Sequence, residues 1–424
     1  MITVFRALSQ RNYRLFFIGQ GISLIGTWMQ NIALSWLVYR MTNSVFLLGI
    51  VGFASQVPTF FLAPFTGVLA DRWNRHRMIV ITQSLAMAQA FILAILTLTG
   101  IIGVWHIIAL ALLLGMINAF DIPIRQSFVV EMVERHDILG NAIALNSFLF
   151  NGARLVGPSI AGVLIGLVGE GMCFLINALS FLLVIFALLA MKIKPRKTHP
   201  TRRHILHELK EGLTYATGFA PIRSILLLLA LVSLIGTPYT TFMPVFARDI
   251  FHGGPYTLGF LMAASGSGAL IGAIYLASRK SVLGLGRMIA TASSLFGSGL
   301  IAFSLSRVFP LSILFLLFIG FGMITQMASS NTMLQTIVDD DKRGRVMSFY
   351  AMAFTGTMPF GSLLGGSLAS KIGVPSTLSI GGILCILGSI TFARQLPALR
   401  PLVRGIYIKK GIISEATLGF EQQQ

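Results

Sequence analysis

Acidic residues are scarce in this sequence, where Asp and Glu supply 14 of 424 positions against 32 for Lys and Arg. Cysteine occurs twice, at Cys173 and Cys385, in apolar segments of different halves, which argues against a disulfide framework and predicts packing roles. The sequence also lacks a clustered His/Asp/Glu set, a nucleophile motif and a glycine-rich phosphate loop. These absences argue against an enzyme, a metal site, a cofactor and ATP-driven transport.

Apolar residues dominate the chain: 55% of it is hydrophobic and the mean hydropathy is +0.82, which is too apolar for a soluble protein. We therefore expect an all-α integral membrane protein. A window of about 19 residues resolves about twelve candidate spans. They lie near 15–39, 45–70, 78–100, 105–132, 141–168, 171–191, 223–247, 256–278, 286–306, 309–336, 346–370 and 374–396. An even number of spans places both termini on one side of the membrane.

The net charge of +18 suggests a nucleic acid partner at first sight, but the basic residues are confined to alternate loops and the termini. One face of the membrane carries most of them, including Arg6, Arg11, Arg14, Arg72, Arg75, Arg77, Lys192 to Lys210, Arg279, Lys280, Arg287, Lys342, Arg343, Arg345 and Arg394 to Lys410. The opposite face carries only Arg40, Arg248, Arg307 and Lys371. The positive-inside rule then places both termini in the cytoplasm and the basic face against anionic lipid headgroups of the cytoplasmic (inner) membrane. We expect no nucleic acid partner and no cleavable signal peptide.

An internal repeat relates the two halves. Ser23-Leu-Ile-Gly-Thr27 recurs as Ser233-Leu-Ile-Gly-Thr237 at an offset of 210 positions, and later glycines align at an offset of 204, as Gly162 does with Gly366. Six spans therefore repeat once. This divides the chain into a first bundle (1–191), a basic linker with an interfacial helix (192–222), a second bundle (223–397) and a tail (398–424).

A dense basic hinge separates the second and third spans, and its charges can lie only at a membrane face. The residues that we single out in it are Gly67, Asp71, Arg72, Arg75 and Arg77. Asp71 can accept hydrogen bonds from an exposed helix N-terminus, and Asn74 is tolerable in the turn because Asn also enters left-handed conformations. The second copy is degenerate, because Ser281 stands where the first has Asp71. The acidic and basic loop 339–345 either places its charges near the first hinge or is a solvated turn.

The fourth span contains Asp121 and Arg125, which are separated by Pro123. If the helix continues to residue 132, Asp121 lies inside the membrane and needs a partner or a proton; Arg125 is four residues away and is the obvious partner. If the helix stops at Pro123, the two form an ion pair at a helix end.

The fifth span contains Arg154, the most deeply placed cation in the chain, about 20 Å beyond its cytoplasmic start. Arg154 can receive an anionic substrate group, pair with Asp121, or serve as a structural or snorkelling side chain. Gly157, Pro158 and Gly162 follow it and allow tight packing and a bend.

Polar residues on four spans are candidates to line a central cavity, although interhelical hydrogen bonding explains them equally well. They are Gln20, Ser23, Thr27, Trp28, Gln30 and Asn31 on the first span, Asn118 on the fourth, Asn146 on the fifth, and Gln326 and Asn331 on the tenth.

The hinge, the repeat and the Gly157-Pro158 segment resemble the major facilitator superfamily, and Arg11-Asn-Tyr-Arg14 and Arg343-Gly-Arg345-Val-Met-Ser348 resemble its siderophore-exporter and macrolide-efflux branch. The resemblance implies two six-helix bundles with substrate held between them, a hinge that closes the cytoplasmic side, and a helix 5 exporter motif with Ala161 in place of one glycine. Relatives in drug and siderophore efflux carry a similar Asp/Arg element in helix 4, which favours proton coupling through Asp121. We expect a monomeric secondary exporter of a small molecule driven by proton entry. A lysophospholipid flippase and a non-transporting sensor are the alternatives.

Overall fold

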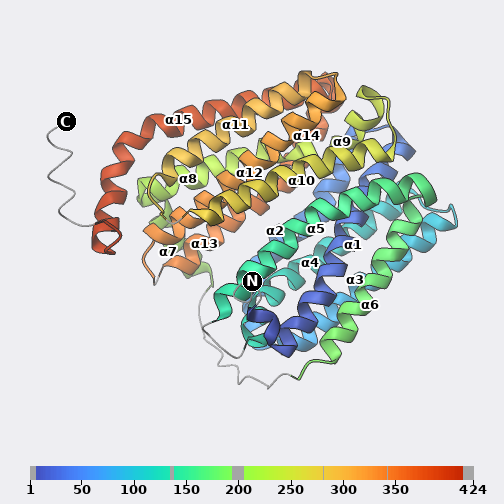
Figure 1. Cartoon of the computed structure of the whole chain (residues 1–424), viewed down its shortest axis with the longest axis horizontal. Coiled ribbons are helices and arrows are strands. Elements are labelled where there is room, and N and C mark those ends of the chain that lie inside the picture. Colours follow the sequence, from blue (N-terminus) through green and yellow to red (C-terminus); the bar gives the residue numbers. More distant parts are fainter. Residues whose placement is uncertain (1–5, 134–137, 193–204, 280, 341, 414–424) are drawn as a thin grey trace.

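The computed structural model describes residues 6–133, 138–192, 205–279, 281–340 and 342–413, without the side chains at 63–65, 67–72, 205–210 and 212. In this part of the chain all regular secondary structure is helical, and Figure 1 shows the helices gathered into two elongated bundles. The predicted all-α membrane fold with two bundles is confirmed.

The first bundle contains six long helices preceded by a short 3-10 helix (Arg6–Ser9). The helices are α1 (Arg11–Thr42), α2 (Val45–Arg72), α3 (Arg75–Leu98), α4 (Val104–Met132), α5 (Leu139–Val168) and α6 (Glu170–Leu189). A shorter helix, α7 (Ile205–Gly218), lies between the bundles in the sequence.

The second bundle has the same number of membrane crossings, but two of them are divided into shorter helices. It contains α8 (Ala220–Leu231), π-helix η3 (Val232–Gly236), 3-10 helix η4 (Thr237–Thr240), α9 (Met243–Val245), π-helix η5 (Phe246–Ile250), α10 (Pro255–Ser278), α11 (Leu285–Leu305), α12 (Phe309–Ile337), α13 (Arg343–Ala351), π-helix η6 (Met352–Gly356), α14 (Met358–Ile372) and α15 (Val374–Lys409).

Ten of the twelve predicted spans are long and apolar enough to cross a membrane within the described residues. The other two are α1, which carries the predicted polar stripe, and the crossing made of α13, η6 and α14. The predicted span over 223–247 lies within the crossing Ala220–Ile250, but this crossing is not one regular helix, because Pro238 and Pro244 cannot donate backbone hydrogen bonds and the helix changes type around them. At the end of the second bundle α15 continues through Pro397 and Pro401, so the boundary set at residue 397 falls inside a helix.

The sequence repeat appears in the structure as equivalent local bonds. The Thr27 hydroxyl donates to the Ser23 carbonyl at 2.9 Å, and Thr237 donates to Ser233 in the second copy. The helix around the second copy is nevertheless irregular, because the position of Trp28 in the first copy is taken by Pro238 in the second. The two copies of the repeat therefore share the Thr–Ser hydrogen bond although they differ in helix type.

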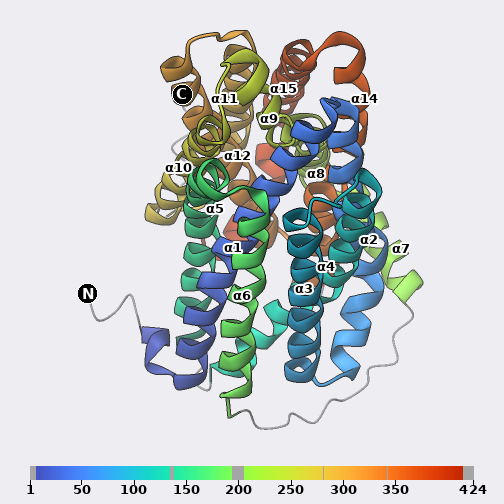
Figure 2. The same cartoon turned by 90° about the vertical axis from the view of Figure 1, so that its right-hand side faces the viewer.

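Two glycine contacts join the bundles at one end, which we call the distal end; it holds the α1–α2 turn at Asn43 and Ser44. At position 162 on α5 a Cβ atom would lie 2.8 Å from the Gly259 Cα on α10, and at position 366 on α14 a Cβ atom would lie 2.9 Å from the Gly49 Cα on α2. Figure 2 shows α5 continuing toward α10 and α2 toward α14. The two contacts are equivalent under the repeat, because its offsets relate Gly49 to Gly259 and Gly162 to Gly366.

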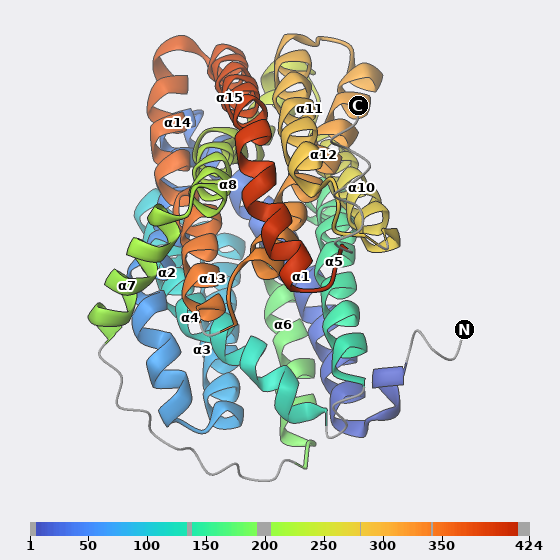
Figure 3. The ribbon, with the colours of Figure 1, turned by 90° about the vertical axis from the view of Figure 1, so that its left-hand side faces the viewer.

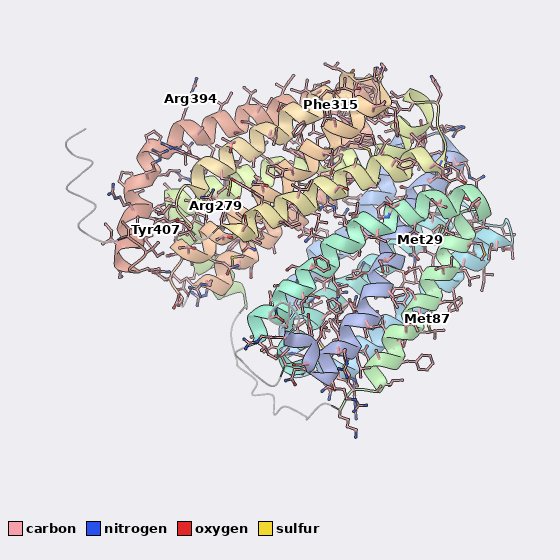
Figure 4. The ribbon with its side chains drawn as sticks, in the orientation of Figure 1. Met29, Met87, Arg279, Phe315, Arg394 and Tyr407 are labelled. Atoms are coloured by element: carbon pink, nitrogen blue, oxygen red, sulfur yellow. The ribbon has the colours of Figure 1, made fainter. Side chains whose placement is uncertain are left out.

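The opposite end, which we call the terminal end, holds the α2–α3 turn and the last turns of α15. In Figure 1 the bundles lie together at the upper right and diverge toward this end. Figure 3 shows α7 beside α13 there, and Figure 4 shows Arg394 projecting outward from α15. Lys410 closes the C-terminus of α12 by donating to the carbonyls of Thr336 and Val338 at 2.9 and 3.0 Å. The long α15 therefore fixes the terminal end of the second bundle.

Alanine at position 162 tests the distal contact. Because the new Cβ atom would meet backbone atoms of α10, which cannot rotate away, we expect Gly162→Ala to lower the free energy of unfolding by about 1–3 kcal/mol. The control is Gly152→Ala on the same helix, where nothing lies within 4 Å and alanine adds helix propensity of up to about 1 kcal/mol. Thermal unfolding of the purified protein measures both, and equal midpoints for the two variants would contradict the packing role of Gly162.

Candidate functional site

The Asp121 carboxylate is buried inside α4 and has three partners. Its Oδ1 accepts hydrogen bonds from the Thr82 hydroxyl and the Gln83 side-chain amide, both at 2.8 Å, and its Oδ2 lies 3.4 Å from Arg125 Nε. Its side chain is 5% exposed. Since α4 continues through Pro123 to Met132, the alternative of a helix-end ion pair is wrong. Asp121 lies about 26 Å along the helix from Val104 and about 16 Å from Met132.

Arg154 lies near the middle of α5 and faces the second bundle. Its guanidinium carbon lies 5.8 Å from the centre of the Trp28 ring on α1, and its Nη2 lies 3.7 Å from the Met323 sulfur on α12. Only 9% of the residue is exposed. The possible pairing with Asp121 does not occur, because the contacts of Asp121 are with α3 and its own helix. The two groups proposed for coupling therefore occupy separate sites.

The glycines that follow Arg154 bring three helices together. A Cβ atom at position 157 would lie 2.6 Å from the Trp28 Cβ on α1, whereas Gly162 contacts α10 as described above. Pro158 is buried inside α5, which continues through it. The predicted tight packing by this motif is confirmed, and it holds α5 between α1 and the other bundle.

The predicted polar stripe on α1 divides into two sides. Gln30 accepts a hydrogen bond from Asn177 on α6 at 2.7 Å and donates one to Gln89 on α3 at 3.2 Å. The prediction that Gln30 lines a central cavity is therefore wrong, because its amide bonds helices within the first bundle. Ser23 is buried and lies on the same side by helical spacing.

Gln20, Thr27 and Asn31 share a different side of α1. Gln20 is buried with a side-chain oxygen that has no partner, Thr27 is half-buried, and Asn31 is exposed. By helical spacing Trp28 points away from Gln30, and its ring packs edge-on against Phe150 of α5, with the ring centres 5.9 Å apart. This Trp28–Phe150 pair stands next to Arg154.

The remaining candidates differ in burial. Gln326 on α12 is 1% exposed, and its side-chain nitrogen has no hydrogen-bond partner. Asn331 accepts a hydrogen bond from Gln335 of the same helix at 2.8 Å, and Asn118 and Asn146 are half-buried. Because α4 and α12 both contain 29 residues, Gln326 occupies the position in α12 that Asp121 occupies in α4.

The basic hinge ties α3 to α4. Arg75 Nη1 lies 2.8 Å from Glu131 Oε1, and Arg77 is exposed. Asn74 does not use the left-handed conformation that Asn tolerates: its φ is −69°, and its side chain caps α3 by accepting from the Arg77 backbone at 3.0 Å. The side chains of Asp71 and Arg72 and the surroundings of Gly67 lie outside the described part of the structure, so the gate role of these residues stays a prediction.

The loop before α13 contacts the linker helix. Asp339 accepts from the Tyr215 hydroxyl at 3.2 Å, Lys342 lies 4.5 Å from the centre of the same ring, and Arg345 pairs with Glu211 at 2.8 Å. Asp339, Lys342 and Arg345 therefore contact α7, whereas the exposed Asp340 pairs with Arg343 in the same segment, which fits the alternative of a solvated turn.

Polar contacts at the distal end were not predicted from the sequence. The Tyr39 hydroxyl donates to the Asp249 carboxylate, and Arg248 donates to the Asn43 side chain at 2.6 Å, so both contacts connect the bundles. Arg40 pairs with Glu170 at 2.7 Å within the first bundle. The sequence contains one indication of the Tyr39–Asp249 contact, because the repeat offset of 210 relates position 39 to position 249.

Metal-binding clusters are absent from the described part of the chain, where no three His, Cys, Asp or Glu side chains gather. Cys173 and Cys385 are both free and fully buried, in agreement with packing roles.

Known proteins resemble the chain along nearly its whole length. A family model described as transmembrane secretion effector matches residues 2–402. The staphyloferrin A transporter of Staphylococcus aureus is 28% identical over 89% of this chain and 95% of the relative. The multidrug efflux pump Tap of Mycolicibacterium fortuitum is 24% identical over 91% and 93%, and macrolide efflux protein A of Streptococcus pyogenes is 21% identical over 87% and 92%.

Solved structures of other transporters share the fold. The peptide transporter PepTSo superposes with a TM-score of 0.71 at 14% identity, over 92% of this chain and 98% of that one. The nucleoside transporter NupG superposes with a TM-score of 0.69 at 12% identity, over 92% and 99%. The family and its relatives are transporters, which confirms that the protein is not an enzyme. The chain belongs to the transmembrane secretion effector family of the major facilitator superfamily.

Proposed function

We propose that the protein is a proton-driven exporter of a small organic molecule that works by alternating access. The observation that carries the proposal is the buried Asp121 site, where one titratable carboxylate inside α4 is held by two neutral donors and one arginine. The names of the relatives, which include a siderophore transporter and drug efflux pumps, support export as the direction.

The distal contacts support alternating access. Gly162 with Gly259, and Gly366 with Gly49, bring the backbones of the two bundles together at the distal end. The bundles diverge toward the terminal end (Figure 1). A carrier that closes one end around such contacts must break them to open that end, which is the motion that alternating access requires.

Coupling follows from the charge balance around Asp121. When the carboxylate is ionised, its two hydrogen bonds from Thr82 and Gln83 hold α3 against α4, and its attraction to Arg125 fixes the side chain within α4. Protonation removes the negative charge and weakens the pair with Arg125. A proton that enters from one side and leaves on the other would then change the packing of the bundle once per cycle.

The distribution of basic residues supports an orientation of the protein in the membrane. We propose that the terminal end faces the cytoplasm, with both termini there, that its arginines and lysines contact anionic lipid headgroups of the inner membrane, and that the protein acts as a monomer.

Replacement of Asp121 by asparagine tests coupling. Asn keeps an oxygen that can accept from Thr82 and Gln83 but lacks the titratable charge, so we expect the variant to fold and to lose gradient-driven efflux. Mass spectrometry of the culture medium first identifies a compound whose export depends on the protein. Efflux of that compound is then measured in membrane vesicles. Exchange of labelled for unlabelled compound needs no gradient and should persist in Asp121→Asn. Wild-type efflux in this variant would disprove the coupling role.

Loss of the Tyr39–Asp249 contact tests the distal closure. Because this bond connects the two bundles, we expect Asp249→Asn combined with Tyr39→Phe to shift the protein toward a conformation that is open at the distal end. Spin labels at Met41 and Ile372, which are exposed on α1 and α14, report the separation, and a longer and broader distance distribution is expected. The control is Arg40→Gln, which breaks an ion pair within one bundle and should leave the distribution unchanged. The same shift in both variants would contradict a specific role for this contact.

A further inference from the structure

Among the side chains that the structure describes, no acidic residue pairs with Arg154. Arg154 is only 9% exposed, and its contacts in the described structure are the Trp28 ring and the Met323 sulfur. Every other buried charge with a printed partner meets an opposite charge: Asp121 meets Arg125, and Glu170 meets Arg40. A thioether and an aromatic face attract a guanidinium but do not neutralise it.

A second donor without a partner lies on the facing helix. Gln326 is one turn from Met323 on α12, so both side chains lie on the same side of that helix. The side-chain nitrogen of Gln326 is buried and unpaired. The first bundle therefore presents a cation, and the second bundle presents a neutral donor near the residue that contacts it. The Arg154 guanidinium and the unpaired nitrogen of Gln326 are both donors, so they are complementary to a ligand that accepts hydrogen bonds.

An aromatic pair defines the next part of the site. Phe150 precedes Arg154 by one helical turn on α5, and its ring packs against Trp28, over which the guanidinium lies. Phe150 is 48% exposed although its neighbours on α1 and α5 are packed closely through Gly157. An apolar surface thus stands beside the charge.

We propose that Arg154 is the substrate-binding residue of this transporter and that the substrate is an organic carboxylate with an apolar or aromatic body. The inference rests on the proposed function, since it names the chemical class that the exporter moves. The guanidinium fork of Arg154 binds the carboxylate, Trp28 and Phe150 contact the apolar body, and Gln326 adds a donor from the second bundle. A carboxylate carries one negative charge, which Arg154 alone balances; a phosphate dianion would need a second cation.

A matched pair of probes tests the charge requirement. Isothermal titration of the purified full-length protein with 2-naphthoate and 2-naphthamide compares two ligands of the same shape, of which only the first is charged. We expect the wild type to bind 2-naphthoate at least about tenfold more tightly. Arg154→Gln should abolish this preference, and Arg154→Lys, which keeps the charge but loses the fork, should retain part of it. The control is Arg223→Gln, an exposed arginine on α8, which should keep the full preference.

Three outcomes would overturn the proposal: no preference for 2-naphthoate in the wild type, no binding of either probe at millimolar concentration, or a preference that survives Arg154→Gln. Thermal unfolding checks that the glutamine variant is folded, and the lysine variant supplies the comparison if it is not. Binding needs no gradient, so its result is independent of vesicle transport. If the protein prefers 2-naphthoate but transports no compound, the proposed binding site stands and the proposed exporter function is wrong. If it transports a compound on a proton gradient but shows no binding preference, the exporter function stands and the proposed binding site is wrong.

Discussion

The free-energy cost of burying a charge governs how this chain is organised. Moving an ion into an apolar interior costs several kcal/mol, which an opposite charge and hydrogen bonds must offset. Exposed arginines such as Arg77 and Arg223 avoid the cost because they stay in contact with solvent, and the buried acids offset it through arginines: Arg125 for Asp121 and Arg40 for Glu170. A cation–π contact contributes only about 0.5–2 kcal/mol, so the Trp28 ring offsets a fraction of the cost at Arg154. The proposed anionic substrate would offset the remaining cost at Arg154 while it is bound.

Glycine determines how closely the two bundles can approach. The backbone contacts at Gly162 with Gly259 and at Gly366 with Gly49 leave no room for a side chain, and the repeat makes them a symmetric pair. Contacts between small residues use only van der Waals attraction and weak polar interactions, so they form and separate without stranding a charge in the membrane. The polar bonds from Tyr39 and Arg248 lie at the edge of this region. Such an interface can open repeatedly, which suits a carrier better than a permanent apolar core would.

The sequence predicted features that depend on composition and period, and it missed those that depend on which helices become neighbours. Long apolar runs and the 210-position repeat were sufficient for the bundles, and a four-residue spacing was sufficient for the Asp121–Arg125 pair. The sequence left two alternatives open for the stripe on α1, because spacing gives a side of a helix but not its neighbour; Asn177 on α6 is the partner that decides the case of Gln30. The N-cap role of Asn74 was not predicted, because a turn residue and an N-cap have the same composition signal.

The two bundles differ where their symmetry would matter most for coupling. Asp121 and Gln326 hold the same position in α4 and α12, but only the first can gain or lose a proton. Asp121 has its hydrogen-bond partners within its own bundle, whereas the nitrogen of Gln326 has none. In the proposed mechanism protonation of Asp121 changes the first bundle directly, so the two halves would respond differently to the same proton. Because the amide of Gln326 does not ionise, its contact with an acceptor would stay independent of the proton that Asp121 exchanges in the proposed cycle.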